Sequence, residues 1–183
     1  MPLCYGGGIK NAEQAKKIFS LGVEKIAISS SAINNPSIIS ELSKLVGRQS
    51  IIVVLDVKKK FLSNKYEIYI HNGIEKTGKD VIDFSKLAEN LGAGEIVINS
   101  IDKDGMMNGY DYTLIENVRN SINLPLTVLG GASSLDDVGK LISSHNIIGA
   151  GAGSLFVFKG KYKAVLINYP NNKEKIDLIN KYL

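Results

Sequence analysis

The sequence predicts an α/β fold in which parallel strands alternate with helices, and two periodic patterns support this. Short apolar runs rich in β-branched residues are typical of strands buried on both faces of a parallel sheet. They occur at residues 26–28, 51–57, 66–70, 96–98, 126–129 and 147–152. Apolar residues at helical spacing lie between them, at residues 12–21, 36–46, 81–91, 113–121, 135–144 and 173–183. This alternation fits either an open doubly wound sheet or a (β/α)8 barrel.

An internal repeat favours the barrel. Residues 2–8 recur as residues 125–131, with Pro-Leu and Gly-Gly at matching places. Each copy continues into a helical stretch, a strand and a small-residue turn, which is Ser29-Ser30 in the first copy and Gly153-Ser154 in the second. Two copies of one β-loop-α-β-loop unit, separated by further βα units, are expected in a barrel built from two duplicated halves.

The composition indicates one soluble globular domain that covers residues 1–183. The chain is 44% hydrophobic and 22% charged, as in ordinary globular proteins. A single cysteine, Cys4, forms no internal disulfide and suits a reducing cytoplasm. The sequence shows neither a signal peptide at its start nor an apolar run long enough to span a membrane. The net charge of +4 is scattered, which argues against nucleic-acid binding and suits small anionic molecules.

The repeated turns predict two anion-binding cradles. A Gly-Gly turn after a parallel strand lets the backbone approach a ligand, and a Ser-rich turn that starts a helix offers hydroxyl and N–H donors. The predicted cradle residues are Gly8, Ser29 and Ser30 in one cradle and Gly130, Gly131, Gly153 and Ser154 in the other. Two such sites across a barrel mouth predict a substrate with a phosphate at each end. The alternative is that the glycines only form tight turns and the serines only cap helices.

Two aspartates follow predicted strands and are candidates for chemistry. Asp56 ends the apolar run 51–55, just before a predicted hairpin through residues 58–73, and could act as a general acid or base. Asp104 lies in the loop after the strand at 96–98 and could bind substrate hydroxyls. Simple loop-capping roles are the alternative for both. The two histidines have no second histidine or cysteine at metal-ligand spacing, so we expect no metal site.

A charged pair is predicted at the opposite ends of two strands. Lys25 and Glu95 each begin a predicted strand. Since side chains alternate between the two faces of a strand, Lys25 lies on the same face as Ser29, and Glu95 on the same face as Asn99. If Ser29 and Asn99 face the barrel lumen, both charges do so as well and could ring its floor. An ion pair on the outside of the barrel is the alternative.

Together these segments resemble the cyclase subunit of imidazole glycerol phosphate synthase, an enzyme of histidine biosynthesis. The resemblance covers nearly the whole chain. Its most specific parts are residues 2–9 with three consecutive glycines, 25–32, the strand end at Asp56, 92–95, 100–105 and the Gly-Tyr-Asp block at 109–111. The related isomerase of the same pathway normally lacks that last block. The resemblance implies a (β/α)8 TIM barrel of the histidine-biosynthesis type, incomplete and covering strands 3 to 8.

The resemblance also implies a reaction and a partner. Ammonia from a separate glutaminase subunit would pass through the lumen and attack a phosphoribulosyl-formimino bisphosphate, giving imidazole glycerol phosphate and aminoimidazole carboxamide ribotide by lyase and cyclisation steps. Asp56 matches one of two catalytic aspartates, and Lys25 and Glu95 match half of a charged ammonia gate. The cradles match two phosphate sites, and the other substrate-contact positions fall on Asn72, Asn99 and Asp104. Neither a cofactor nor a metal is implied.

Two departures from the family pattern leave alternatives open. Strands 1 and 2, the second catalytic aspartate and the other half of the gate have no counterpart, which predicts a gene fragment, a truncated chain or completion by another chain. A stable, well-behaved monomer would contradict all three. The other departures are Tyr5, Met106 to Asn108 and the tail at 158–170, which look more like paralogues from surface-polysaccharide clusters. Such a paralogue would conduct ammonia from a glutaminase to a sugar amidotransferase, and an inactive fragment is a further alternative.

Overall fold

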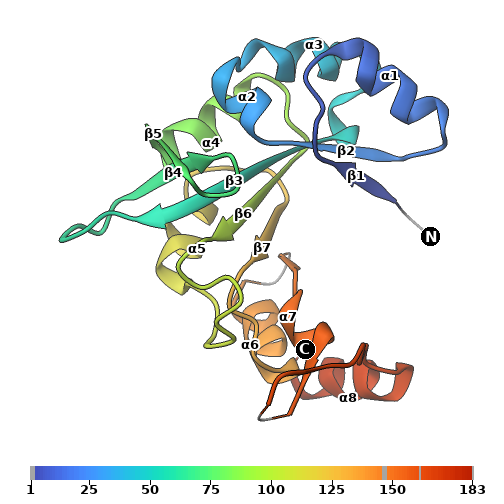
Figure 1. Ribbon diagram of the computed structural model, residues 1–183, viewed down its shortest axis with the longest axis vertical. Helices are drawn as coiled ribbons and strands as arrows, with labels where there is room; N and C mark the ends of the chain where they lie inside the picture. Colours follow the sequence, from blue (N-terminus) through green and yellow to red (C-terminus); the bar gives the residue numbers. More distant parts are fainter. Residues whose placement is uncertain (1–2, 146–147, 161, 183) are drawn as a thin grey trace.

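The computed structural model describes residues 3–145, 148–160 and 162–182. Within these ranges, parallel strands form an open, curved sheet in the order β1-β2-β3-β6-β7-β8 (Figure 1). The strands are β1 (Cys4–Gly6), β2 (Lys25–Ile28), β3 (Ile51–Lys59), β6 (Glu95–Ser100), β7 (Leu126–Leu129) and β8 (Gly149–Ala150). The predicted α/β fold of an incomplete (β/α)8 barrel is confirmed, with β1 and β8 at the two edges of the sheet.

The described helices include six that lie almost where the apolar spacing predicts them and two short ones, at residues 30–34 and 154–157, that it did not predict. They are α1 (Ala12–Ser20), α2 (Ser30–Asn34), α3 (Ser37–Val46), α4 (Val81–Asn90), α5 (Tyr112–Arg119), α6 (Leu135–His145), α7 (Ser154–Val157) and α8 (Asn172–Tyr182), with a 3₁₀ turn, η1, at Arg48–Ser50. Side-chain caps fix several starts: Asn11 accepts a hydrogen bond from Gln14 N–H, and Asp80 accepts one from Ile82 N–H. Some predicted features reach residues outside the described ranges. They are the start of the domain at Met1, the start of the repeat at Pro2, the start of a strand at Ile147, the tail position Lys161 and the helix end at Leu183.

The two faces of the sheet differ in burial. Side chains of one parity, such as Ile26, Val53, Leu55 and Ile98, are at most 2% exposed and pack with the helices. Full burial of each such side chain contributes about 1.5 to 3 kcal/mol to folding. The other parity would line the barrel lumen, and it carries the predicted site residues. This separation of the two faces is the geometric basis of the site.

An antiparallel ribbon extends from the end of β3. Strand β4 (Tyr66–Ile70) pairs with β3, and β5 (Glu75–Asp80) pairs with β4, so the predicted hairpin is present with one strand more than predicted. The polar sequence of β5 carries no strand signal. In Figure 1 the tip between β3 and β4 projects away from the sheet.

The chain ends in a small hairpin and a docked helix. Strands β9 (Phe158–Lys159) and β10 (Ala164–Val165) form the hairpin, which the sequence did not predict. Helix α8 then packs on α6, as Figure 1 shows. Among the described helices, none is both long and apolar enough to cross a lipid bilayer.

Candidate functional site

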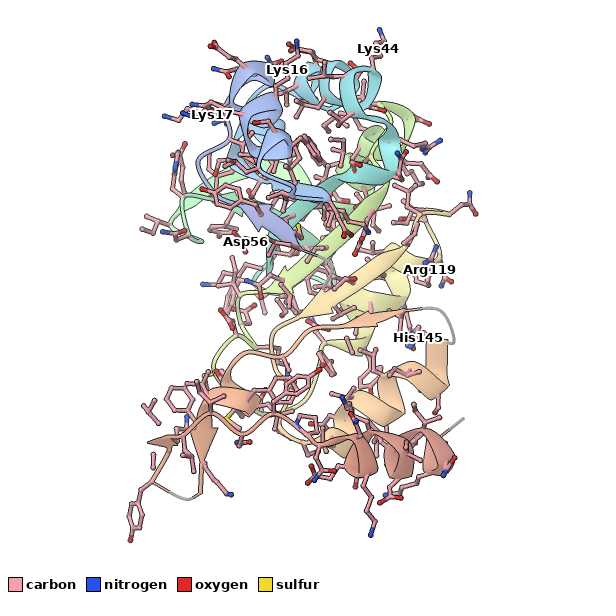
Figure 2. All side chains as sticks on the ribbon, turned by 90° about the vertical axis from the view of Figure 1, so that its right-hand side faces the viewer. Lys16, Lys17, Lys44, Asp56, Arg119 and His145 are labelled. Carbon is pink, nitrogen blue, oxygen red and sulfur yellow. The ribbon has the colours of Figure 1, made fainter. Side chains whose placement is uncertain are left out.

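The lumen face carries polar side chains at both ends of the strands and apolar ones between them. Asp56 and Asn99 lie at the carboxyl ends of β3 and β6, where barrel enzymes hold their reactive groups. Lys25 and Glu95 begin β2 and β6 at the opposite end. The residues between them on this face are Ala27, Ile52, Val54 and Val97. Figure 2 places Asp56 at the sheet, whereas the labelled lysines lie on the outer helices.

Asp56 is held by its neighbour on the next strand. The two residues are directly opposite in the parallel register, and Asn99 Nδ2 donates a hydrogen bond to Asp56 Oδ1 over 2.9 Å. Because Asn99 is a neutral donor, it orients the carboxylate and leaves the second oxygen, Oδ2, available to a substrate. Both side chains are partly exposed on the lumen face.

The second predicted cradle comes together beside this pair. Gly130 and Gly131 have φ angles of +88° and +104°, a left-handed conformation that glycine adopts without strain. A Cβ at Gly130 would lie 3.2 Å from Asn99 Oδ1, so the cradle touches the Asp56 and Asn99 pair. A small cavity of about 20 Å³ is lined by Asp104, Gly105, Met107, Gly130, Gly131, Ala132, Gly151, Ala152, Gly153 and Ser154. All five predicted residues on this side of the mouth therefore share one cavity.

Two hydrogen bonds from the Gly-Tyr-Asp block hold the backbone of this cradle. Gly109 N–H donates a hydrogen bond to the carbonyl oxygen of Gly131 over 2.8 Å, and Tyr110 Oη donates one to the carbonyl oxygen of Gly151 over 3.0 Å. Burial raises the pKa of Tyr110 to about 12, and the charge of Asp137 contributes. Sequence analysis found this block distinctive but assigned it no role. In the structure its role is to hold the cradle backbone through these two hydrogen bonds.

Asp111, the last residue of the block, joins two elements. Its Oδ1 caps α5 by accepting a hydrogen bond from Leu114 N–H over 3.1 Å, and it accepts one from Tyr66 Oη over 2.9 Å. Burial first, and then this bond and the charge of Asp111, raise the pKa of Tyr66. The β4 strand is thus tied to the loop that carries the cradle.

The first predicted cradle lies at the carboxyl ends of β1 and β2. Gly7 and Gly8 have φ angles of +108° and +73°, the same conformation as the second glycine pair, and Ser29 precedes α2 as Gly153 precedes α7. The glycine pairs in the two halves of the repeat therefore all have positive φ. A Cβ at Gly8 would meet nothing within 4 Å, so space above this turn is open.

The β4–β5 turn reaches the first cradle. His71 N–H donates to Ser30 Oγ over 3.4 Å, which brings the turn against the start of α2. Asn72 follows in this turn with a φ of +60° and an exposed side chain. The structure therefore places Asn72 on the mouth side, in the turn whose His71 contacts Ser30.

The charged pair at the floor is on the lumen face, not outside the barrel. Lys25 Nζ lies 2.8 Å from Glu95 Oε2, and Thr127 Oγ1 donates to Glu95 Oε1 over 2.8 Å. Burial and the charge of Glu95 raise the pKa of the neighbouring Cys4 thiol, while Lys25 opposes this. Sequence reasoning did not single out Thr127. It lies opposite Val97 in the register of β6 and β7, and therefore on the lumen face.

The two histidines lie apart from these groups. His71 Nε2 lies 3.4 Å from Glu75, and His145 stacks on Tyr112. In the described part of the chain, no group of three or more histidine, cysteine, aspartate or glutamate side chains could hold a metal ion.

Comparison with known proteins identifies related sequences. A family model described as "Histidine biosynthesis protein" matches residues 1–163. A Vibrio vulnificus protein, provisionally named imidazole glycerol phosphate synthase subunit hisF3, is 55% identical over 175 residues, which cover 96% of this chain and 67% of that protein. A Leptospira borgpetersenii protein, provisionally named subunit HisF of the same synthase, is also 55% identical over 175 residues, covering 96% of this chain and 69% of that protein.

A third relative is more distant. The imidazole glycerol phosphate synthase subunit HisF of Prochlorococcus marinus is 42% identical over 139 residues, which cover 75% of this chain and 54% of that protein. Fold and site together define a protein of the (β/α)8 barrel class with glycine-rich loops at the carboxyl ends of its strands. Within that class, the chain belongs to the histidine biosynthesis protein family.

Proposed function

We propose that this chain supplies the cyclase part of an imidazole glycerol phosphate synthase, using ammonia to convert a phosphoribulosyl-formimino bisphosphate into imidazole glycerol phosphate and aminoimidazole carboxamide ribotide. The names of the relatives in Vibrio vulnificus and Prochlorococcus marinus support this assignment. The observation that carries it is the position of Asp56 and Asn99 on one sheet face, with glycine-rich cradles at the same end of the strands. A bisphosphate would use one cradle for each phosphate.

In this proposal Asp56 transfers protons at the reacting centre. Asn99 fixes one of its carboxylate oxygens, so the other oxygen would face the substrate. Asp104, next to Gly130 and Gly131 in the shared cavity, would bind substrate hydroxyls. Asn72 would contact the substrate from the side of the first cradle.

Ammonia would reach this centre from the other end of the strands. Lys25 and Glu95 form an ion pair at that end, on the face that would line the lumen, and would supply half of a charged gate that incoming ammonia has to pass. We propose that a glutaminase subunit docks below them and releases ammonia there. The apolar residues Ile52, Val54 and Val97 between floor and mouth would let ammonia pass without trapping it as ammonium.

A second candidate function is an ammonia conduit that serves a sugar amidotransferase. The departures from the usual cyclase sequence favour it: they are Tyr5, Met106 to Asn108 and the tail at 158–170. Met107, in the stretch that departs from the usual cyclase sequence, lines the second cradle and has a φ of +52°. A changed cradle is expected if a different acceptor binds there.

Turnover with ammonium salts separates the two candidates. The assay would use this chain and a chimera in which the two βα units expected of the family precede Leu3. The cyclase proposal predicts bisphosphate turnover by the chimera and a loss of about 10² to 10⁴ in rate for Asp56→Asn. A folded chimera that binds a glutaminase without turning over the bisphosphate would instead support the conduit.

A further inference from the structure

The ribbon formed by β3, β4 and β5 contains a cleft that belongs to neither cradle. Its volume is about 630 Å³, within the range of small-molecule sites. The lining residues are Lys58, Lys59, Lys60, Phe61, Glu67, Tyr69, Lys76 and Gly78. Half of them are lysines, and the proposed reaction uses none of the eight.

A buried carboxylate organises this cleft. Glu67 is 3% exposed, although a buried charge is costly unless it is paired. The register of β4 and β5 shifts between Glu67 and Tyr69, and in this bulge Gly78 has a φ of +76°. Gly78 N–H donates to Glu67 Oε1 over 2.7 Å. The bulge therefore provides a fixed backbone donor for one carboxylate oxygen.

The other oxygen of Glu67 positions two lysines. Lys60 Nζ lies 3.8 Å and Lys76 Nζ 3.7 Å from Glu67 Oε2. Both lysines remain partly exposed, so their ammonium groups keep donors for a ligand. Lys58 is directly opposite Glu67 in the antiparallel register and shares its side of the ribbon. Three ammonium groups against one carboxylate leave the cleft with an excess of positive charge.

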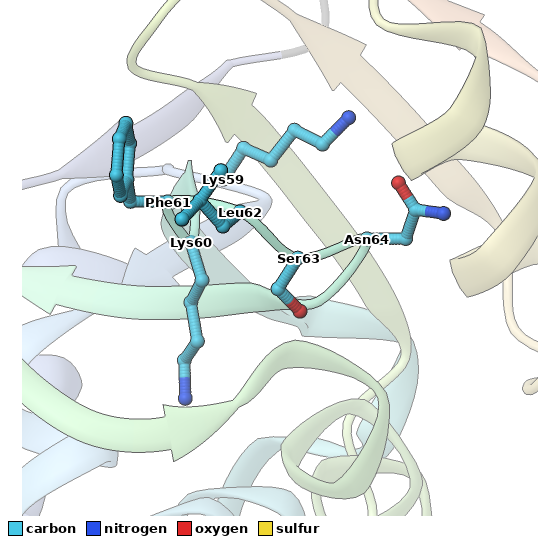
Figure 3. A pocket seen from close by; sticks show the side chains of 6 residues that line it. All are labelled: Lys59, Lys60, Phe61, Leu62, Ser63 and Asn64. Atoms are coloured by element: carbon cyan, nitrogen blue, oxygen red, sulfur yellow. The ribbon is translucent and has the colours of Figure 1, made fainter.

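The cleft lies on the same face as the candidate catalytic carboxylate. Asp56 pairs with Tyr69 in the register of β3 and β4, and Tyr69 pairs with Lys76 in that of β4 and β5. In Figure 3, which shows the neighbouring hairpin tip at residues 59–64, Lys59 and Lys60 point to opposite sides, as alternation along a strand requires. A ligand in the cleft would therefore lie beside the mouth of the barrel.

We propose that this cleft binds the diphosphate group of a small anionic molecule, with Lys58, Lys60 and Lys76 as donors and Glu67 as the residue that positions two of them. Ammonium groups form strong charge-assisted hydrogen bonds to phosphate oxygens. Tyr69, on the same side of the ribbon as Glu67, adds an aromatic surface for the remainder of the molecule.

The test is an NMR titration of the ¹⁵N-labelled chain with inorganic pyrophosphate. The Gly78 amide reports on the cleft, and the Gly131 amide reports separately on the second cradle. Saturable shifts at Gly78 are expected, with affinity reduced about tenfold by Lys60→Gln, by Lys76→Gln and by Lys58→Gln. Lys58→Gln leaves both ion pairs of Glu67 intact, so it tests the site without unpairing the buried carboxylate.

Lys65→Gln is the matched control. It removes the same charge from the same hairpin but does not line the cleft, so affinity at Gly78 should change less than twofold. Equal weakening by Lys65→Gln would overturn the proposal in favour of a diffuse basic field. Shifts at Gly131 alone would also overturn it, as would tighter binding of a glutamate decapeptide than of pyrophosphate, which would indicate an acidic protein partner.

Discussion

The backbones of Gly109 and Gly131 touch at the second cradle. Gly109 N–H donates to the carbonyl oxygen of Gly131 over 2.8 Å, and a Cβ at Gly131 would overlap the carbonyl oxygen of Gly109. The contact joins the distinctive Gly-Tyr-Asp block to the glycine pair. It gives a structural reason why position 131 needs glycine, in addition to its φ of +104°.

Gly131→Ala should therefore destabilise the protein. Strain at this φ and the overlap with Gly109 are expected to lower the free energy of unfolding by about 1 to 3 kcal/mol, measured by urea denaturation. Gly153→Ala is the control in the same cavity, because a Cβ there meets nothing within 4 Å and φ is −104°. An equal loss in both variants would contradict the proposed contact.

Tyr66→Phe should remove a charge-assisted hydrogen bond. The loss of the bond to Asp111 is expected to lower the free energy of unfolding by about 1.5 to 3 kcal/mol near pH 7. Because the folded-state pKa of Tyr66 is raised, its stabilising effect is full below pH of about 10 and is lost as the pH rises further. The stability of Tyr66→Phe should therefore fall less steeply above that pH. Tyr162→Phe, at a 90% exposed position, should match the wild type.

Periodicity predicted the parts of the structure that depend on burial. The parity of Lys25 and Glu95 along their strands placed both on the lumen face, and the structure has them 2.8 Å apart. The repeat likewise placed the two glycine pairs, all of which have positive φ. The face on which a strand residue lies and the positive φ of a glycine turn both depend on nearby residues, so they can be inferred from the sequence alone.

Features that depend on tertiary contacts had no signal in the periodicity or the repeat of the sequence. Strand β5 is polar and is fixed by pairing with β4. The supporting contact of Tyr110 with the Gly151 carbonyl joins residues from separate βα units, as does that of Thr127 with Glu95. Only the assembled sheet brings these partners together.

Asn99→Asp would place two carboxylates at hydrogen-bond distance. Since like charges disfavour ionisation, the pKa of the pair at positions 56 and 99 should rise in the folded state. A raised carboxyl pKa costs stability at neutral pH, by about 1 to 3 kcal/mol, and the loss should shrink as the pH falls toward 4. Denaturation between pH 4 and 8 measures this. Asn99→Leu should show no such pH dependence relative to the wild type, and a pH-independent loss in both would refute the close pairing.

The Lys25 and Glu95 pair should contribute little to folding. Lys25 is 44% exposed, so a double-mutant cycle with Lys25→Met and Glu95→Gln is expected to give a coupling of about 1 kcal/mol or less. Added salt should reduce it further. A glutaminase partner, if it docks here, should lose binding or ammonia transfer in Lys25→Met without a change in melting temperature. A large fall in melting temperature would make the pair structural.

Gly139→Ala should reverse the usual effect of this substitution in a helix. Alanine normally stabilises a helix interior by about 0.5 to 1 kcal/mol over glycine. A Cβ at Gly139 of α6 would overlap the ring of Tyr182 in α8, so the variant should instead lose stability and release α8. Limited proteolysis would detect earlier cleavage within residues 172–182. Adding Tyr182→Ala removes the overlap, so in that background Gly139→Ala should regain its ordinary stabilising sign; a destabilising effect in both backgrounds would show that the contact with Tyr182 is not the cause.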